Sequence, residues 1–146
     1  MTLQNLLKIQ SLVEFKAQRE DVRRLLVAAE RNLNDAAVTA ISDENRFDVA
    51  YKCVMQCALA SLLVHGYRPS KSKPGHHQIV IQSLPLTVGL DAKTVVVLDG
   101  LRKQRNINDY DGDPISPTAV NECVKQAEAL LAHVRSWLNQ YHPEMC

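Results

Sequence analysis

Aromatic residues and glycine are scarce in this sequence. The 146 residues include two phenylalanines, four tyrosines, one tryptophan and five glycines, whereas Ala, Leu and Val are abundant. Strands favour aromatic and β-branched residues, and helices favour alanine and leucine, so the composition predicts an all-α protein. Apolar residues make up 46% of the chain, which is enough to fill one core. We therefore expect a single domain over residues 1–146.

An excess of charge of one sign is also lacking, because 17 Lys and Arg stand against 16 Asp and Glu. A chain without a net field does not attract nucleic acid or lipid over long range. Any anion-binding site must therefore be a local cluster of cations.

The sequence further lacks the marks of export and of membrane insertion. Residues 1–10 contain no basic segment followed by an apolar one, and no apolar run approaches the roughly 20 residues that span a bilayer. The four cysteines, Cys53, Cys57, Cys123 and Cys146, show no C-x-x-C spacing. We expect a cytoplasmic protein with no membrane association, no disulfide, no metal and no other cofactor.

Long helical patterns are what the sequence does contain. Apolar residues recur at i, i+3, i+4 and i+7 over residues 19–37 and again over residues 117–141. Another helix is predicted over residues 42–65, because Ser42 can cap its first turn and Gly66 can end it in the left-handed conformation.

Two shorter apolar segments, 78–84 and 94–98, are ambiguous because their β-branched runs favour strands. Three long helices cannot easily cover two isolated strands, so we interpret both segments as helices. Residues 67–75 are rich in turn formers and are predicted to be a loop, and residues 2–16 a short turn or helix. The predicted fold is an antiparallel four- or five-helix up-and-down bundle.

The histidines do not form an evident site. His76 and His77 are adjacent, so they lack the i, i+4 spacing of a metal-binding pair on a helix. We expect one of them to pack beneath the loop at Tyr67 and the other to be solvated. His65 and His133 lie within predicted helices and are interpreted as packing or hydrogen-bonded residues.

The segment 102–113 is the strongest candidate for a functional site. In a helix that begins near Asp91, Arg102 and Arg105 lie on one side, and residues 111–114 then force a turn. Two arginines at the end of a helix suit a phosphate, because a guanidinium can bind it through paired donors.

This segment also carries a family resemblance. The sequence Arg105-Asn106-Ile107-Asn108-Asp109-Tyr110 resembles the R-N-x-x-D-Y signature of HEPN domains, especially the small stand-alone bacterial and archaeal group. The helix with Ala50-Tyr51 and Ala58, followed by Gly66-Tyr67-Arg68-Pro69 and Gly75-His76-His77, is similar to the second helix and following loop of that family. The resemblance covers residues 47–114 and rests on the order and spacing of these matches.

The resemblance implies a bundle of four or five helices, often a homodimer whose arginine segments face each other. It also implies two activities. Many members are metal-independent endoribonucleases of toxin–antitoxin or defence modules, and some form complexes with a minimal nucleotidyltransferase. In the ribonucleases, the arginine of an R-x4-6-H motif binds the scissile phosphate, an adjacent polar residue positions the RNA, and the histidine helps to move the proton of the 2′-hydroxyl.

This chain departs from that motif, because Tyr110, Asp111 and Gly112 occupy the window where the histidine would stand. A free tyrosine has a pKa of about 10, so only about one in a thousand is ionised at pH 7. Tyr110 could still donate a hydrogen bond to phosphate while an aspartate acts as base. The candidate site residues are Arg105, Asn106 and Tyr110 for catalysis, Arg102 and Arg105 for phosphate binding, and Asp109 and Asp111 in support.

We therefore expect a HEPN-type protein of a toxin–antitoxin or defence module that binds RNA or nucleotide phosphate at a basic helix end, as a homodimer. One alternative is a metal-independent endoribonuclease in which Tyr110 or a nearby aspartate replaces the histidine. Another is a non-catalytic partner subunit of a nucleotidyltransferase antitoxin. The last is structural, with Arg105 paired to Asp43, Asp48 or Asp109.

Overall fold

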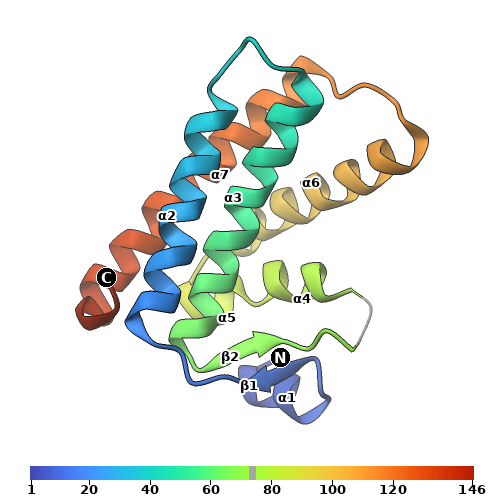
Figure 1. The fold of residues 1–146 in the computed structure, drawn as a ribbon. Coiled ribbons are helices and arrows are strands. Elements are labelled where there is room, and N and C mark those ends of the chain that lie inside the picture. The colour runs from blue at the N-terminus through green and yellow to red at the C-terminus, as the bar shows by residue number, and fades with distance from the viewer. Residues whose placement is uncertain (73–74) are drawn as a thin grey trace.

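The computed structural model describes residues 1–72 and 75–146 and consists mainly of helices, with one small two-stranded sheet (Figure 1). In chain order the elements are α1 (Leu3–Lys8), β1 (Leu12–Glu14), α2 (Arg19–Ala36), α3 (Asp43–Val64), β2 (Tyr67–Pro69), α4 (His76–Gln82), α5 (Leu84–Val88), α6 (Ala92–Asp111), α7 (Pro117–Tyr141) and the 3-10 turn η1 (Pro143–Met145). The all-α class predicted from the composition is therefore confirmed, with the sheet as an addition.

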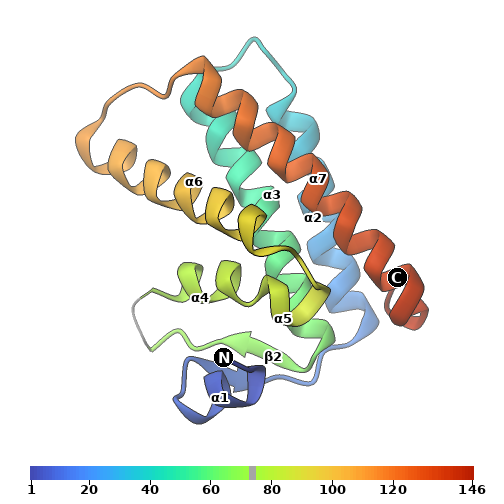
Figure 2. The same cartoon turned by 180° about the vertical axis from the view of Figure 1, so that it is seen from behind.

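The three long predicted helices, now α2, α3 and α7, pack side by side around the core (Figures 1 and 2). The central helix is α3, and many of its buried residues are small, including Ala50, Cys57 and Ala58. Small side chains let neighbouring helices approach closely. One 18-residue window of α3 is long and apolar enough to cross a membrane, and 61% of that window is buried.

The ends of these helices follow the capping rules. The Ser42 hydroxyl accepts a hydrogen bond from the Asn45 amide at 3.2 Å, and the Ser116 hydroxyl accepts one from the Ala119 amide at 3.1 Å. Gly66, just after α3, has φ of 87°, a conformation that costs little without a Cβ. The predicted bounds of the helices at 42–65 and 117–141 are thus confirmed to within a residue or two.

Both ambiguous segments are helical, as predicted. Val80, Ile81, Leu84 and Val88 are buried on α4 and α5, and their spacing matches the helical period. The valine run at 95–97 lies in α6. In α4 and α5, burial against the rest of the fold outweighs the weak strand preference of β-branched residues.

The prediction of a loop over residues 67–75 is wrong at its start. Residues 67–69 form β2, which pairs antiparallel with β1 so that Leu12 faces Pro69 and Glu14 faces Tyr67. The pairing joins segments far apart in the sequence, and Leu12, 1% exposed, anchors the N-terminal arm. Local propensity cannot reveal such a contact. Residues 73 and 74 of the predicted loop lie outside the described residues.

Helix α6 lies on the side of α3 opposite α2 (Figures 1 and 2). Only Leu98 and Leu101 of α6 are buried, and the short helix α4 packs against both α6 and α3. This arrangement brings the C-terminal half of α6, which carries the predicted site, next to α3 and α4.

Candidate functional site

Arg105 is held over the surface of α3 by an aromatic ring and two carboxylates. Its guanidinium carbon lies 5.1 Å from the centre of the Tyr51 ring. Its Nε lies 3.4 Å from Asp48 Oδ1, and its Nη2 lies 3.9 Å from Asp109 Oδ2. Two of the acid partners that the structural alternative proposes are therefore present.

These ion pairs are loose and partly solvated. The side chains of Asp48 and Asp109 are 45% and 58% exposed, and pairs of this kind stabilise a fold by at most about 1 kcal/mol. Nε of Arg105 is buried yet makes no hydrogen bond to the described residues. Loose ion pairs and the Tyr51 ring therefore position Arg105, and its Nε faces Asp48 without a hydrogen bond.

A cavity of about 510 Å³ opens beside Arg105 between α3, α4 and the segment after β2. It is lined by Tyr51, Lys52, Met55, Gln56, Leu59, Pro69, Lys71, His76, His77, Val80 and Arg105. Three of these residues are permanent cations, two are histidines, and none of those in the described part of the chain is an acid. We call this space the Arg105 cavity.

Arg105 also borders a second, smaller hollow of about 100 Å³ with the opposite character. That hollow is lined by Glu44, Phe47, Asp48, Arg105, Asn108, Asp109, Gly112, Asp113 and Ile115. The guanidinium therefore lies at a boundary between a carboxylate-rich hollow and the acid-free Arg105 cavity.

His77 joins Arg105 in this cavity, a placement that the sequence reasoning missed. Its Nδ1 lies 3.3 Å from the hydroxyl of Tyr51, whose ring stacks under Arg105. The rings of His76 and His77 lie edge to face with centroids 4.6 Å apart. The Gly75-His76-His77 sequence was the available signal, but nothing local to it indicates that α4 faces α6.

Burial keeps both His77 and Tyr51 uncharged at neutral pH. Partial burial lowers the pKa of His77, and His76, Arg105 and Arg102 lower it further. Burial raises the pKa of Tyr51 to about 12 although Arg105 and Arg102 oppose the shift. If the proton of His77 sits on Nδ1 and is donated to the Tyr51 oxygen, Nε2 is left free to accept a proton.

The other predicted site residues lie outside the Arg105 cavity. Arg102 Nε donates to Asp99 Oδ1 at 2.8 Å, with both side chains about 15% exposed, and this bond lowers the pKa of Asp99. Asn106 and Asp111 are exposed, and the Tyr110 side chain is 92% exposed. The predicted roles of Asn106, Tyr110 and Asp111 in catalysis and support stay predictions. Of the predicted site residues, Arg105 alone lines the Arg105 cavity.

Comparison with protein-family models, with curated proteins and with solved structures gives no match to this chain. Function is therefore inferred from the geometry of the site and from the sequence resemblance.

Proposed function

We propose that this protein binds the phosphate of RNA or of a nucleotide in the Arg105 cavity, as a HEPN-type protein of a toxin–antitoxin or defence module. The observation that carries the proposal is Arg105 itself, whose guanidinium lies over the Tyr51 ring and lines a cavity that has no acid among its described residues. A guanidinium in that state gains more from an anion than one already saturated by carboxylates.

The rest of the cavity matches the other parts of a nucleotide. Lys52 and Lys71 supply further positive charge, and Met55, Leu59 and Val80 supply apolar surface for a base or sugar. A chain with a net charge of only +1 carries no general attraction for anions. The local absence of acids is therefore what makes this position favourable for phosphate.

Binding of AMP and of a short RNA by isothermal titration tests this proposal. Arg105→Gln should weaken both affinities about tenfold or more, the loss expected for a charge-assisted hydrogen bond to phosphate. Arg23→Gln, which removes the same charge from an exposed pair with Glu20 on α2, is the matched control. Equal affinities in wild type and Arg105→Gln would contradict the proposal.

A second candidate function, metal-independent endoribonuclease activity, is favoured by the neutral His77 in the same cavity as Arg105. In this reaction, His77 Nε2 takes the proton of the 2′-hydroxyl, and the 2′-oxygen attacks phosphorus. The bond from phosphorus to the 5′-oxygen breaks, the leaving oxygen takes a proton, and a 2′,3′-cyclic phosphate forms. Arg105 stabilises the charge on the phosphoryl oxygens.

Cleavage of RNA in the presence of a chelator tests the second candidate. His77→Gln should lower the rate about 100-fold or more if His77 is the base, and kcat/KM of the wild type should rise with pH through a pKa below 6.5. Tyr110→Phe serves as the comparison, because Tyr110 lies outside the cavity. If Tyr110→Phe loses the cleavage rate and His77→Gln keeps it, the alternative in which Tyr110 replaces the histidine would be supported instead. If the wild type cleaves no RNA in the presence of the chelator, the ribonuclease candidate is contradicted and only the proposed binding function stands.

The proposed assembly is a cytoplasmic homodimer of an antiparallel helical bundle that joins through α6. Val96, Ile107 and Tyr110 recur along one face of α6 and are 71%, 55% and 92% exposed. Large apolar residues that are exposed on one helix face are the part of that face best suited to an interaction with another chain. A nucleotidyltransferase partner would use the same face of α6. The Tyr110 hydroxyl is exposed on this face and would be accessible to modification by that partner.

A further inference from the structure

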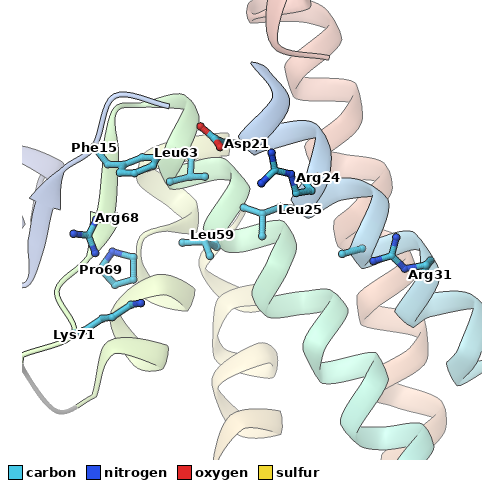
Figure 3. A pocket seen from close by; sticks show the side chains of 11 residues that line it. Phe15, Asp21, Arg24, Leu25, Arg31, Leu59, Leu63, Arg68, Pro69 and Lys71 are labelled. Carbon is cyan, nitrogen blue, oxygen red and sulfur yellow. The ribbon is translucent and has the colours of Figure 1, made fainter. Parts of the chain in front are cut away.

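A second large cavity lies on the far side of Pro69 and Lys71 from Arg105. It measures about 680 Å³ and lies between α2, α3 and β2 (Figure 3). It is lined by Phe15, Asp21, Arg24, Leu25, Ala28, Arg31, Leu59, Leu63, Arg68, Pro69 and Lys71. We call it the α2 cavity.

The two sides of the α2 cavity carry unpaired cations. Arg24 and Arg31 stand on α2, two helical turns or about 10 Å apart, and Arg68 and Lys71 stand on the opposite side (Figure 3). Within residues 1–72 and 75–146, none of these four forms an ion pair. The guanidinium carbon of Arg68 instead lies 5.9 Å from the centre of the Phe15 ring.

The single carboxylate among the described residues of this cavity is already engaged. Asp21 Oδ2 accepts a hydrogen bond of 2.8 Å from the Gln18 amide and so caps the start of α2. In Figure 3 it lies beside Leu63 at one end, away from Arg31 and Lys71. The remaining charge in the cavity is therefore positive and available to an anion.

Aliphatic side chains lie between the two cationic sides. Leu25 projects from α2, and Leu59 and Leu63 project from α3, between Arg24 on one side and Arg68 on the other (Figure 3). A duplex would present its phosphates on a convex surface with its bases hidden. A hollow with apolar surface and basic rims suits unstacked bases whose phosphates lie along the edges.

The α2 cavity and the Arg105 cavity share Leu59, Pro69 and Lys71. They are therefore neighbouring parts of one groove, with Arg105 and Lys52 in one part and Arg24, Arg31 and Arg68 in the other. The position of Lys71 in both parts lets one ammonium group contact a ligand on either side of Pro69.

We infer that the α2 cavity is a second phosphate-binding site, continuous with the first, and that the ligand is a single-stranded RNA segment of several nucleotides rather than a mononucleotide. This inference rests on the proposed function of the Arg105 cavity. Arg24, Arg31, Arg68 and Lys71 bind successive phosphates, while Leu25, Leu59 and Leu63 contact the bases. A cationic groove that follows the backbone is how proteins hold single strands without reading their sequence.

The test compares ligand length across variants. Binding of AMP and of fluorescein-labelled U8 is measured by titration at several salt concentrations for the wild type, Arg105→Gln, and the double variant Arg24→Gln/Arg31→Gln. The control is Arg19→Gln/Arg23→Gln, which removes two charges from the same helix outside both cavities. All four substituted positions on α2 are exposed, so the variants should fold, and circular dichroism checks this.

The double variant Arg24→Gln/Arg31→Gln should bind U8 about tenfold more weakly and AMP as the wild type does. Its salt slope for U8 should be smaller by about 1.4, the value expected when two contacts to a single strand are lost. Arg105→Gln should weaken both ligands, and the control double variant should change neither.

Failure of this inference and failure of the proposed function would give different results. If the wild type binds AMP but binds U8 no more tightly than AMP, the inference is overturned and the proposed function stands. The same holds if Arg24→Gln/Arg31→Gln binds U8 as tightly as the wild type does. Absence of both AMP and U8 binding in the wild type overturns both. An oligoglutamate of eight residues that displaces U8 at equal concentration would show an acidic peptide site and would also overturn the inference.

Discussion

Arg105 separates two electrostatic environments, and its neighbours determine how strongly it can bind an anion. On one side, Asp48 and Asp109 compete for the guanidinium. On the other side, the Arg105 cavity contains Lys52, Lys71 and no acid among its described residues. The proposed attraction for phosphate is the difference between these two influences, so single substitutions should alter it in either direction.

Removal of the competing acid should strengthen phosphate binding. In Asp48→Asn, Arg105 loses its 3.4 Å carboxylate partner, so affinity for AMP should rise about two- to fivefold, the range for a partly exposed ion pair. Isothermal titration measures the change, and Asp35→Asn on the exposed end of α2 is the control for net charge. An affinity that falls in Asp48→Asn would indicate that Asp48 holds Arg105 in its binding position.

His77 should make the stability of the protein depend on pH in acid. Its pKa is below the 6.5 of the unfolded chain because of partial burial and nearby cations. Above pH 6.5 the imidazole is neutral in both states, and below it the unfolded state binds the proton more readily. The contribution of the neutral His77 to the free energy of unfolding is therefore fully present above pH 6.5 and is lost as the pH falls through the pKa of His77 in the folded state.

The measurement is urea unfolding of the wild type and His77→Gln at pH 7.5 and pH 5.5. The wild type should lose more free energy of unfolding between these pH values than His77→Gln does. His142→Gln, on the far end of α7, is the control. Identical losses in the wild type and His77→Gln would show that His77 is as accessible to protons in the fold as in the unfolded chain.

At the scale of elements, α6 is the helix that depends least on packing. Leu98 and Leu101 are its buried residues, and its Arg102 and Lys103 pair with Asp99 one turn away. Such local pairs add only a few tenths of a kcal/mol each to a helix. The stability of α6 should therefore respond clearly to intrinsic helix propensity.

Gly100 offers a direct test of that point. It lies inside α6, is exposed, and a Cβ there would meet no atom within 4 Å. Gly100→Ala should raise the free energy of unfolding by about 0.5–1 kcal/mol, because alanine loses less backbone entropy in a helix. Gly89→Ala is the opposite control: φ is +67° at Gly89, so the same change should destabilise the protein by about 1 kcal/mol. Thermal or urea unfolding measures both, and no gain in Gly100→Ala would indicate that α6 does not form in solution.

At the scale of the whole molecule, the core and the groove share the helix α3. It contributes Phe47, Val54 and Leu62 to the interior, Lys52 and Leu59 to the groove, and the buried Tyr51 to both. The outer face of α6 belongs to neither and carries the exposed apolar residues Val96 and Ile107. The groove and the outer face of α6 are therefore separate surfaces, and the proposals assign the first to a ligand and the second to a partner.

The proposed homodimer predicts that Ile107→Glu is monomeric at concentrations where the wild type is a dimer, because a charge would be desolvated in an apolar interface. Light scattering coupled to gel filtration measures the mass of each. Val38→Glu, at an exposed apolar site away from α6, is the control. A wild type that is monomeric at all concentrations tested would contradict the dimer.

The positions of the long helices and the candidate residue Arg105 could be predicted from local sequence patterns. Helical periodicity, capping serines and a terminal glycine act within a few residues, so the bounds of α3 and α7 could be predicted closely. The helical state of 78–84 and 94–98 also followed, although it required an argument about the whole fold.

The groups that surround Arg105 could not be predicted, because they meet through packing between distant segments. His77, Tyr51 and Lys71 come from three segments distant in sequence, and the β1–β2 pairing that positions the segment before Lys71 has no local signature. The way α4 and α6 lie against α3 depends on many small packing contacts that no short pattern encodes. His77 and Arg105 line one cavity because folding brings α4 against α6, a contact that no spacing in the sequence indicates.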